Sequence, residues 1–281
     1  LIGGLAGDAL TTSSSNTALG YLALSAETTG EGNTAVGQST LSAQNVASSG
    51  LVYNTAVGYQ AGLAVTTGIQ NTLVGGLTGD SLTDADFNVA MGVSALGGDT
   101  KGSKSTALGY FALSVQNFTS ATDTLNVAVG HVAGTAMTTG IENTFVGSLA
   151  GDALTDADGN VALGAYALST DTLGSRAVAI GHGALLTQNF TSATNNYNIG
   201  IGHSAGRSIT TGIQNTLIGG LAGDSITVGD NNVAVGASAL GANTEGNKNV
   251  AIGDSALGTL NITSQADSHN IGIGGHAGLS V

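Results

Sequence analysis

Proline, cysteine and tryptophan are absent from this 281-residue chain, and only 8% of its residues are charged. A typical soluble domain has about 25% charged residues. The absence of cysteine excludes a Cys–His catalytic pair. Low charge also occurs in disordered chains, but disorder is not expected here, because 41% of the residues are hydrophobic and supply apolar surface to bury. We therefore expect a folded chain whose core consists of small and branched aliphatic side chains.

Basic residues are scarce as well. Five Lys and Arg residues stand against 18 Asp and Glu residues, which gives a formal net charge of −13. A nucleic-acid-binding protein needs a basic stripe, and an anionic membrane surface attracts basic segments. No apolar run of the sequence approaches the roughly 18 residues of a membrane-spanning helix. We therefore expect no nucleic-acid partner and no membrane insertion by this chain.

A five-residue phrase, typified by Asn54-Thr55-Ala56-Val57-Gly58, returns along the whole chain. Two 17-residue steps and one 21-residue step lead to Gly58, and from there three 17-residue steps and one 21-residue step recur as a 72-residue period. A fixed period of this kind is typical of repeat architectures, so each step is interpreted as one coil of a solenoid. The phrase glycines are Gly3, Gly20, Gly37, Gly58, Gly75, Gly92, Gly109, Gly130, Gly147, Gly164, Gly181, Gly202, Gly219, Gly236, Gly253 and Gly274.

The phrase is interpreted as a β-strand, because β-branched residues are common, Gly recurs every few positions and no 3.6-residue period is sustained. Successive side chains of a strand point to opposite faces. Thr55 and Val57 therefore share one face, and Asn54, Ala56 and Gly58 share the other. A coil this thin is expected to leave its small-residue face exposed. Burial of that face against sister chains, in an intertwined homotrimer, is the expected remedy.

The sequence thus predicts an all-β fold, a parallel β-roll or β-solenoid of about sixteen coils. A single continuous domain is expected to span residues 1–281. The chain is seven residues short of four 72-residue periods and ends on Leu279-Ser280-Val281 without a polar cap, so we expect it to be a segment of a longer array.

The segments between phrases are rich in Gly, Thr and Asp, as turns are. Every fourth coil has four additional residues and is expected to project a larger loop. The segments that contain these large loops read LSAQNVASSGLVY, LSVQNFTSATDTL, LLTQNFTSATNNY and LGTLNITSQADSH.

The phrases NTAVGYQAG, NTALGYLAL and STALGYFAL, followed by TTG turns and returning with a 17-residue period, resemble the repeats of bacteriophage tail-fibre and marine surface-fibre proteins. They are also similar to the head repeats of trimeric autotransporter adhesins. This resemblance covers essentially the whole chain. It implies a parallel β-roll in each chain, three chains intertwined about one axis, and an extracellular stalk or adhesive head. The regular 72-residue superperiod departs from the pattern of that family.

The phrase glycines are interpreted as structural, because Gly permits a positive φ or a close approach of backbones. Their spacing matches no G-x-G-x-x-G or P-loop pattern, so they are not expected to bind phosphate. Asn opens thirteen of the fifteen complete coils, and Ser105 and Ala177 are the exceptions. This Asn column predicts a hydrogen-bonded ladder, with a sugar-binding row as the alternative.

Two acidic turns are the candidates for a bound ion. GDSLTDADFN contains Asp80, Asp84 and Asp86, and GDALTDADGN contains Asp152, Asp156 and Asp158. Clustered carboxylates with backbone carbonyls suit Ca²⁺, although the pattern matches no EF-hand loop. Solvated turns without an ion are the alternative. No other cofactor is expected.

Other candidate sites lie on the large loops and beside the phrase glycines. Asn117, Asn189 and Asn261 each begin an N-x-T sequon on a large loop, which predicts glycosylation sites. His131, His182 and His203 each follow a phrase glycine directly. Packing or surface histidines are one interpretation, and a three-nitrogen metal site around a three-fold axis is the other.

No catalytic constellation stands out, and a uniform stack of coils offers no cleft to hold one, so we expect a non-enzyme. The leading hypothesis is a structural segment, shaft or head, of an extracellular trimeric adhesin or of a phage or virion tail fibre, which presents loops or a distal tip to a host-surface receptor or glycan. The alternatives are a self-assembling end-to-end filament and an ice- or glycan-binding repeat surface. Thr pairs such as Thr66-Thr67 occur mainly on one coil in four, which gives no continuous Thr face.

Overall fold

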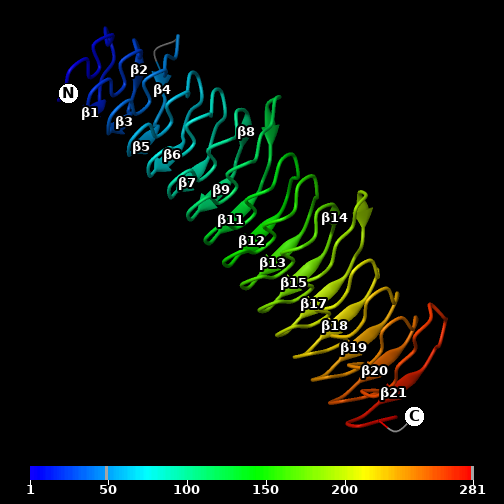
Figure 1. Ribbon diagram of the computed structural model, residues 1–281. Coiled ribbons are helices and arrows are strands. Elements are labelled where there is room, and N and C mark those ends of the chain that lie inside the picture. Colours follow the sequence, from blue (N-terminus) through cyan, green and yellow to red (C-terminus); the bar gives the residue numbers. More distant parts are fainter. Residues whose placement is uncertain (48–49, 280–281) are drawn as a thin grey trace. The chain divides into compact units, whose positions relative to one another are not determined.

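The computed structural model describes residues 1–47 and 50–279, and the chain divides into two compact units, Leu1–Glu142 and Asn143–Val281. Each unit is an all-β parallel solenoid, in which every coil contributes one short strand to a single sheet (Figure 1). The predicted fold class is therefore confirmed. The expectation of one continuous domain stays a prediction, and each unit is described by itself.

The sheet of the first unit contains seven three-residue strands in chain order: β1 (Thr17–Leu19), β3 (Thr34–Val36), β5 (Thr55–Val57), β6 (Thr72–Val74), β7 (Val89–Met91), β9 (Thr106–Leu108) and β11 (Val127–Val129). The sheet of the second unit contains eight: β12 (Thr144–Val146), β13 (Val161–Leu163), β15 (Val178–Ile180), β17 (Ile199–Ile201), β18 (Thr216–Ile218), β19 (Val233–Val235), β20 (Val250–Ile252) and β21 (Ile271–Ile273). Ile2 joins the first sheet through a single parallel bridge to Leu19.

Like residues of successive coils lie beside each other. In β5 and β6, Thr55 pairs with Thr72, and Val57 pairs with Val74. The register also holds across a 21-residue coil, since Val178 of β15 pairs with Ile199 of β17. The four additional residues are therefore absorbed outside the sheet.

Three small two-stranded sheets lie at the large loops. They are formed by β2 (Gly30–Glu31) with β4 (Gly50–Leu51), β8 (Gly102–Ser103) with β10 (Thr122–Asp123), and β14 (Gly174–Ser175) with β16 (Thr194–Asn195). Part of the first predicted loop, residues 48–49, lies outside the described residues, as do Ser280 and Val281.

The close spacing of the coils and the backbone conformation explain why glycine is required at the phrase positions. The φ values of the phrase glycines lie between 118° and 145°, a region that L side chains rarely adopt. In addition, a Cβ added to Gly58 would overlap the carbonyl oxygen of Gly75 in the next coil. Any larger residue would therefore have to push two coils apart.

The expectation about the two strand faces was wrong. The small-residue face points into the coil: Ala56, Ala90 and Ala162, for example, are fully buried within their own chain. The branched residues point outward, and Met91 and Leu163 are 50% and 44% exposed. The physical reason is that the coil closes on that side of the strand. Ala fills the inner position of most strands, and Leu73 and Phe145 fill it where glycines such as Gly79 and Gly151 leave room for them.

Two types of coil alternate in pairs, as seen at the fourth and seventh residues after each phrase glycine. We call these positions +4 and +7. In the apolar type, Gly at +4 accompanies an aliphatic residue at +7, as in Gly62 with Val65 and Gly79 with Leu82. A Cβ on Gly62 or Gly79 would lie 2.9 Å from the side chain of Leu73, so these glycines make room for the larger strand residue. In the polar type, a buried Leu at +4 accompanies a polar residue at +7, except in the last such coil, where Leu257 accompanies Leu260.

Candidate functional sites

The Asn column forms the predicted hydrogen-bonded ladder, and its side chains are buried inside the coils except at Asn16 and Asn270, the first and last members. The amide Nδ2 of Asn71 donates to the carbonyl oxygen of Ala85 (2.8 Å), and its Oδ1 accepts the backbone N–H of Asn88 (3.0 Å). In the second unit, Asn215 donates to Gly229 and accepts from Asn232 in the same way. Because these amides bond to the chain's own backbone and are fully buried, the column cannot serve as a sugar-binding row.

The large loops repair the two breaks in this ladder. Ala177 has no side-chain oxygen to offer the N–H of Asn198, and Oδ1 of Asn196 accepts that N–H instead (2.9 Å). Thr124 has the equivalent place beside Ser105, and their hydroxyls lie 2.6 Å apart. Where Asn33 keeps the ladder intact, the equivalent loop residue is the buried, apolar Val52. The ladder residue and the loop residue therefore form a matched pair.

A buried carboxylate lies at the base of the second and third large loops. The carboxylate of Asp171 accepts the backbone N–H groups of Gly174 and Phe190 (both 3.0 Å) and Nε2 of Gln188 (2.6 Å). The amide oxygen of Gln188 then accepts Nδ2 of Asn198 (2.9 Å). Each loop is thereby connected to the Asn ladder through one acid and one glutamine.

The same arrangement recurs with small changes. Asp99 accepts from Gly102, Phe118 and Gln116 in the first unit. At the first loop, Glu27 accepts from Gly30 (2.7 Å) and Gln44 (3.0 Å). Sequence reasoning missed these groups. The available signal was the +7 column, in which an acid and then Gln follow two aliphatic residues.

Three of the five basic residues, Lys104, Arg176 and Lys248, contact the outside of the large loops, and Arg176 donates to the hydroxyl of Tyr197 (2.7 Å). Lys104 and Lys248 form exposed ion pairs with Asp123 and Asp267, both at 2.5 Å. Hydrogen bonding to Lys248 lowers the pKa of the Asp267 carboxyl. Exposed pairs of this kind contribute little to stability. These ion pairs therefore hold the loops to the core only weakly. The stronger connection is the buried one, through the acid and the Gln at the base of the first three loops.

The predicted calcium ligands are engaged with the protein in several ways. Asp84 lies 3.7 Å from Lys101, and Oδ1 of Asp86 accepts the backbone N–H of Ile69 (2.8 Å). The backbone N–H of Asp158 donates to Ser175 (2.9 Å). Asp156 also has an interaction partner. In residues 1–47 and 50–279, no three His, Cys, Asp or Glu side chains are grouped to hold a metal ion. The Ca²⁺ site stays a prediction, which calorimetric titration with Ca²⁺ would test.

Asp80, Asp152 and Asp224 occupy equivalent places in successive 72-residue periods. Burial raises the pKa of each of these carboxyls, and a backbone hydrogen bond partly opposes the change. Oδ1 of Asp152 is buried without a hydrogen-bond partner. This row therefore contains carboxylates that the fold desolvates without fully compensating them.

The three sequon asparagines are exposed at the large loops, where a glycan has room. Oδ1 of Asn117 accepts the hydroxyl of Thr100 (3.1 Å), and Asn189 and Asn261 accept from Thr172 (3.1 Å) and Thr244 (3.0 Å) in the same way. Phe118, the middle residue of the first sequon, is only 7% exposed. Glycosylation stays a prediction, which mass spectrometry of material from the native source would test.

The histidines that follow phrase glycines stack on their neighbours. The His131 ring lies parallel to that of Tyr110, with centroids 5.4 Å apart. His182 and His203 stack on each other at 5.5 Å. The sequence placed these residues in one column, but it did not show which of them have an imidazole as neighbour.

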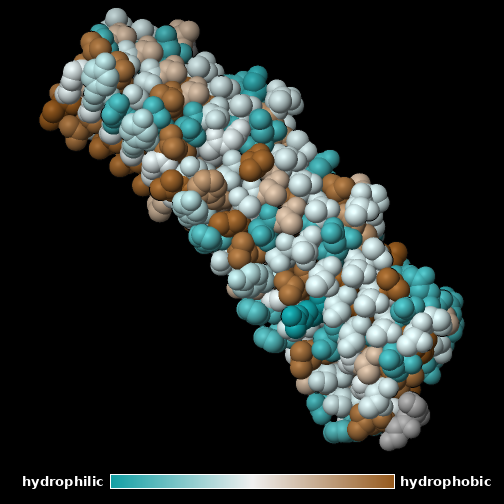
Figure 2. Space-filling view, viewed as in Figure 1, coloured by the Kyte–Doolittle hydropathy of each residue, from teal (hydrophilic) through white to brown (hydrophobic). Residues whose placement is uncertain are grey.

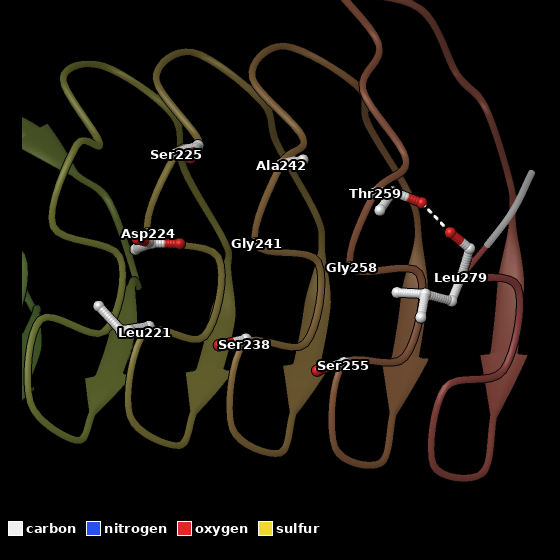
Figure 3. A pocket seen from close by; sticks show the side chains of 10 residues that line it. All are labelled: Leu221, Asp224, Ser225, Ser238, Gly241, Ala242, Ser255, Gly258, Thr259 and Leu279. Atoms are coloured by element: carbon white, nitrogen blue, oxygen red, sulfur yellow. Dashed lines mark hydrogen bonds between the residues drawn. The ribbon is translucent and has the colours of Figure 1, made fainter.

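An open groove of about 380 Å³ runs along the coils between Leu221 and Leu279 of the second unit (Figure 3). Gly241 and Gly258 leave space between Asp224 and Leu279, and Ser238 and Ser255 also line the groove. Ligand pockets combine apolar and aromatic walls with a few polar groups. No aromatic residue lines this groove, so we assign it no ligand.

Comparison with protein-family models and with curated proteins finds no match for this chain. In the described part of the chain, no helix is long and apolar enough to cross a membrane.

Proposed function

We propose that this chain is a structural segment of an extracellular fibre, the shaft or head of a trimeric adhesin or of a phage or virion tail fibre. The observations that carry this proposal are the parallel ladder of each unit and the apolar file that the third residues of the three-residue strands form on its outer face. The ladder resists local opening because every coil is bonded to the coils beside it. The large loops, connected to the core by buried groups, are then the elements that a fibre presents to a receptor or glycan.

The outer aliphatic face supports the homotrimer. Figure 2 shows apolar residues at the surface of both units. In the second unit, the outward strand residues are mostly Val and Ile, and Ile218 and Ile252 are 37% and 38% exposed. A contiguous apolar face of this kind marks an interaction surface. We propose that it, and not the small-residue face, is what sister chains bury.

Sedimentation equilibrium of the full chain tests the trimer, with Ile180→Lys/Ile201→Lys as the interface variant. We expect a discrete trimer for the natural sequence and a monomer for the variant, because these outward residues of β15 and β17 lose their apolar partners. Asn189→Lys, on the third large loop, is the matched surface control and should remain trimeric. If the natural chain were monomeric and its far-UV spectrum still showed a folded β-protein, the proposal would be contradicted. Open-ended growth would instead support the end-to-end filament.

A second candidate function rests on the first unit alone. There the first residue of β1, β3, β5 and β6 is an outward-facing Thr, beside a second file of Leu and Val. Sequence reasoning overlooked this Thr file because it considered only the Thr pairs of the turns. We propose ice binding as its function, with Thr34→Lys/Thr55→Lys as the variant. Loss of ice-recrystallisation inhibition in that variant would support this function, and no inhibition by the natural chain would exclude it.

A further inference from the structure

We propose that His182 and His203 together bind one divalent transition-metal ion, such as Cu²⁺, Ni²⁺ or Zn²⁺. The two residues follow Gly181 and Gly202, which end the neighbouring strands β15 and β17. Ile180 pairs with Ile201 in this ladder, so the histidines lie directly side by side. Their ring centroids are 5.5 Å apart, and their planes differ by 8°.

The distance between the two rings suits chelation after a small adjustment. Imidazole nitrogens bind Zn²⁺ at about 2.0–2.1 Å, which places two ligand nitrogens of one ion roughly 3–3.5 Å apart. The ring centroids are farther apart than this, so the rings have to tilt toward each other for one nitrogen of each to reach the same ion. Both side chains are exposed, so they are free to tilt and water has access to the remaining coordination positions.

The surroundings leave both imidazoles available. In the described part of the chain, neither side chain has a hydrogen-bond or ion-pair partner. The Tyr166 ring lies edge-on to the His182 ring, with centroids 5.8 Å apart, and the His203 ring stacks on the His182 ring. His131 differs, because its stacking neighbour is Tyr110, which leaves it without a second imidazole.

A metal ion bound at this site is expected to exchange with ions in solution. Structural zinc sites have four protein ligands, whereas this site has two imidazoles completed by water. The order of divalent-metal affinities predicts that Cu²⁺ binds more tightly than Ni²⁺ or Zn²⁺. A bound ion would join the two ends of the coil that contains the third large loop and would stabilise that coil.

The test uses the full chain without an affinity tag, titrated with CuCl₂ by calorimetry and followed by electron paramagnetic resonance. We expect one Cu²⁺ per chain, two equatorial nitrogens in the spectrum, and reversal by a chelator. His182→Gln and His203→Gln should each weaken binding at least tenfold and remove the two-nitrogen signature. His131→Gln is the matched control and should bind as the natural chain does.

Unchanged Cu²⁺ affinity in His182→Gln/His203→Gln would overturn the proposal, as would the absence of saturable binding in the natural chain. Far-UV circular dichroism of each variant shows whether the solenoid remains folded. Because both substitutions are at exposed positions, the fold should be retained. A variant that binds weakly because it has unfolded is thereby distinguished from one that has lost a ligand.

Discussion

The third and fourth large loops of the second unit leave the core in the same way along the chain but are connected to it differently. At the third loop, the carboxylate of Asp171 bonds to two backbone N–H groups and to Gln188. At the fourth loop, Asn243 takes the place of the acid and bonds to its own turn at Gly246 (3.0 Å), and Leu260 replaces the glutamine. Phe190 of the third loop is 5% exposed, whereas Ile262, its equivalent in the fourth loop, is only half-buried. A 21-residue coil thus closes with either arrangement: the third loop reaches the Asn ladder through Asp171 and Gln188. The fourth loop reaches it through the hydroxyl of Ser268, which donates to Oδ1 of Asn249 (2.8 Å).

The largest effect is expected for Asp171→Ala. The substitution leaves two buried N–H groups and one amide without an acceptor, and each unpaired group costs about 1–3 kcal/mol. We expect a loss of about 3–5 kcal/mol in the free energy of unfolding, measured by urea denaturation. Asn243→Ala is the matched control at the fourth loop and should cost about 1 kcal/mol. Equal costs at the two sites would remove the distinction between the loops.

Transplanting the fourth arrangement into the third loop should cost less than breaking the third. In Asp171→Asn/Gln188→Leu the new Asn bonds to its own turn, and no buried amide is left without its carboxylate partner. We expect this variant to be about 2 kcal/mol more stable than Asp171→Ala. Hydrogen exchange should show faster exchange at the backbone N–H of Phe190, because its acceptor has been replaced. Protection of that N–H equal to the natural chain's would contradict this account of how the loop is held.

The loops also differ in how the ladder continues. The third loop relies on Asn196 because the ladder residue is Ala177, whereas at the fourth loop Asn249 accepts the N–H of Asn270 itself (3.2 Å). We expect Asn196→Val to cost about 1–3 kcal/mol in urea denaturation. Ala177→Asn/Asn196→Val recreates the pairing of Asn33 with Val52 and should recover most of that loss. A double variant no more stable than the single one would refute the compensation.

The smallest effect is expected at Asp152, a carboxylate of the same unit with a buried oxygen that has no partner. Burial raises the pKa of this carboxyl above its ordinary value of 3.8. The folded state therefore binds the proton more tightly than the unfolded state, so the stabilisation is full below pH 3.8 and is lost as pH rises through the raised pKa. Asp152→Asn should be slightly more stable than the natural chain at pH 7 and no more stable at pH 3. At Asp171 the same removal of charge should instead destabilise the protein, and thermal unfolding at both pH values compares the two.

Much of the fold could be predicted from the sequence, because the repeat itself encodes it. The spacing of the phrase glycines predicts the stacking of coils, and the Asn column predicts the buried ladder. The assignment of inside and outside failed because alternation along a three-residue strand separates two faces without saying which one is enclosed. The side on which the coil closes decides that Ala56, like Leu73 at the equivalent position of the next strand, lies inside and that Val57 faces outward.

The sites were less accessible to prediction. Asp171 and Gln188 lie on successive coils of the chain, and each resembles an ordinary turn residue when read alone. Their meeting depends on the stacking of coils, as does that of His182 and His203. By contrast, the Asp80, Asp84 and Asp86 cluster is conspicuous in the sequence because its members are close along the chain, yet the fold directs these side chains to different neighbours.

The matched pairs of ladder and loop residues limit how this repeat can be copied. Ala177 is tolerated because Asn196 follows it within the same 72-residue period, and Val52 is tolerated because Asn33 precedes it. A genetic crossover between copies that separated the members of a pair would place Ala beside Val and leave a buried amide hydrogen without an acceptor. Recombination that exchanges whole periods keeps each pair together, so the period itself is the unit in which such an array can lengthen or shorten without loss of stability.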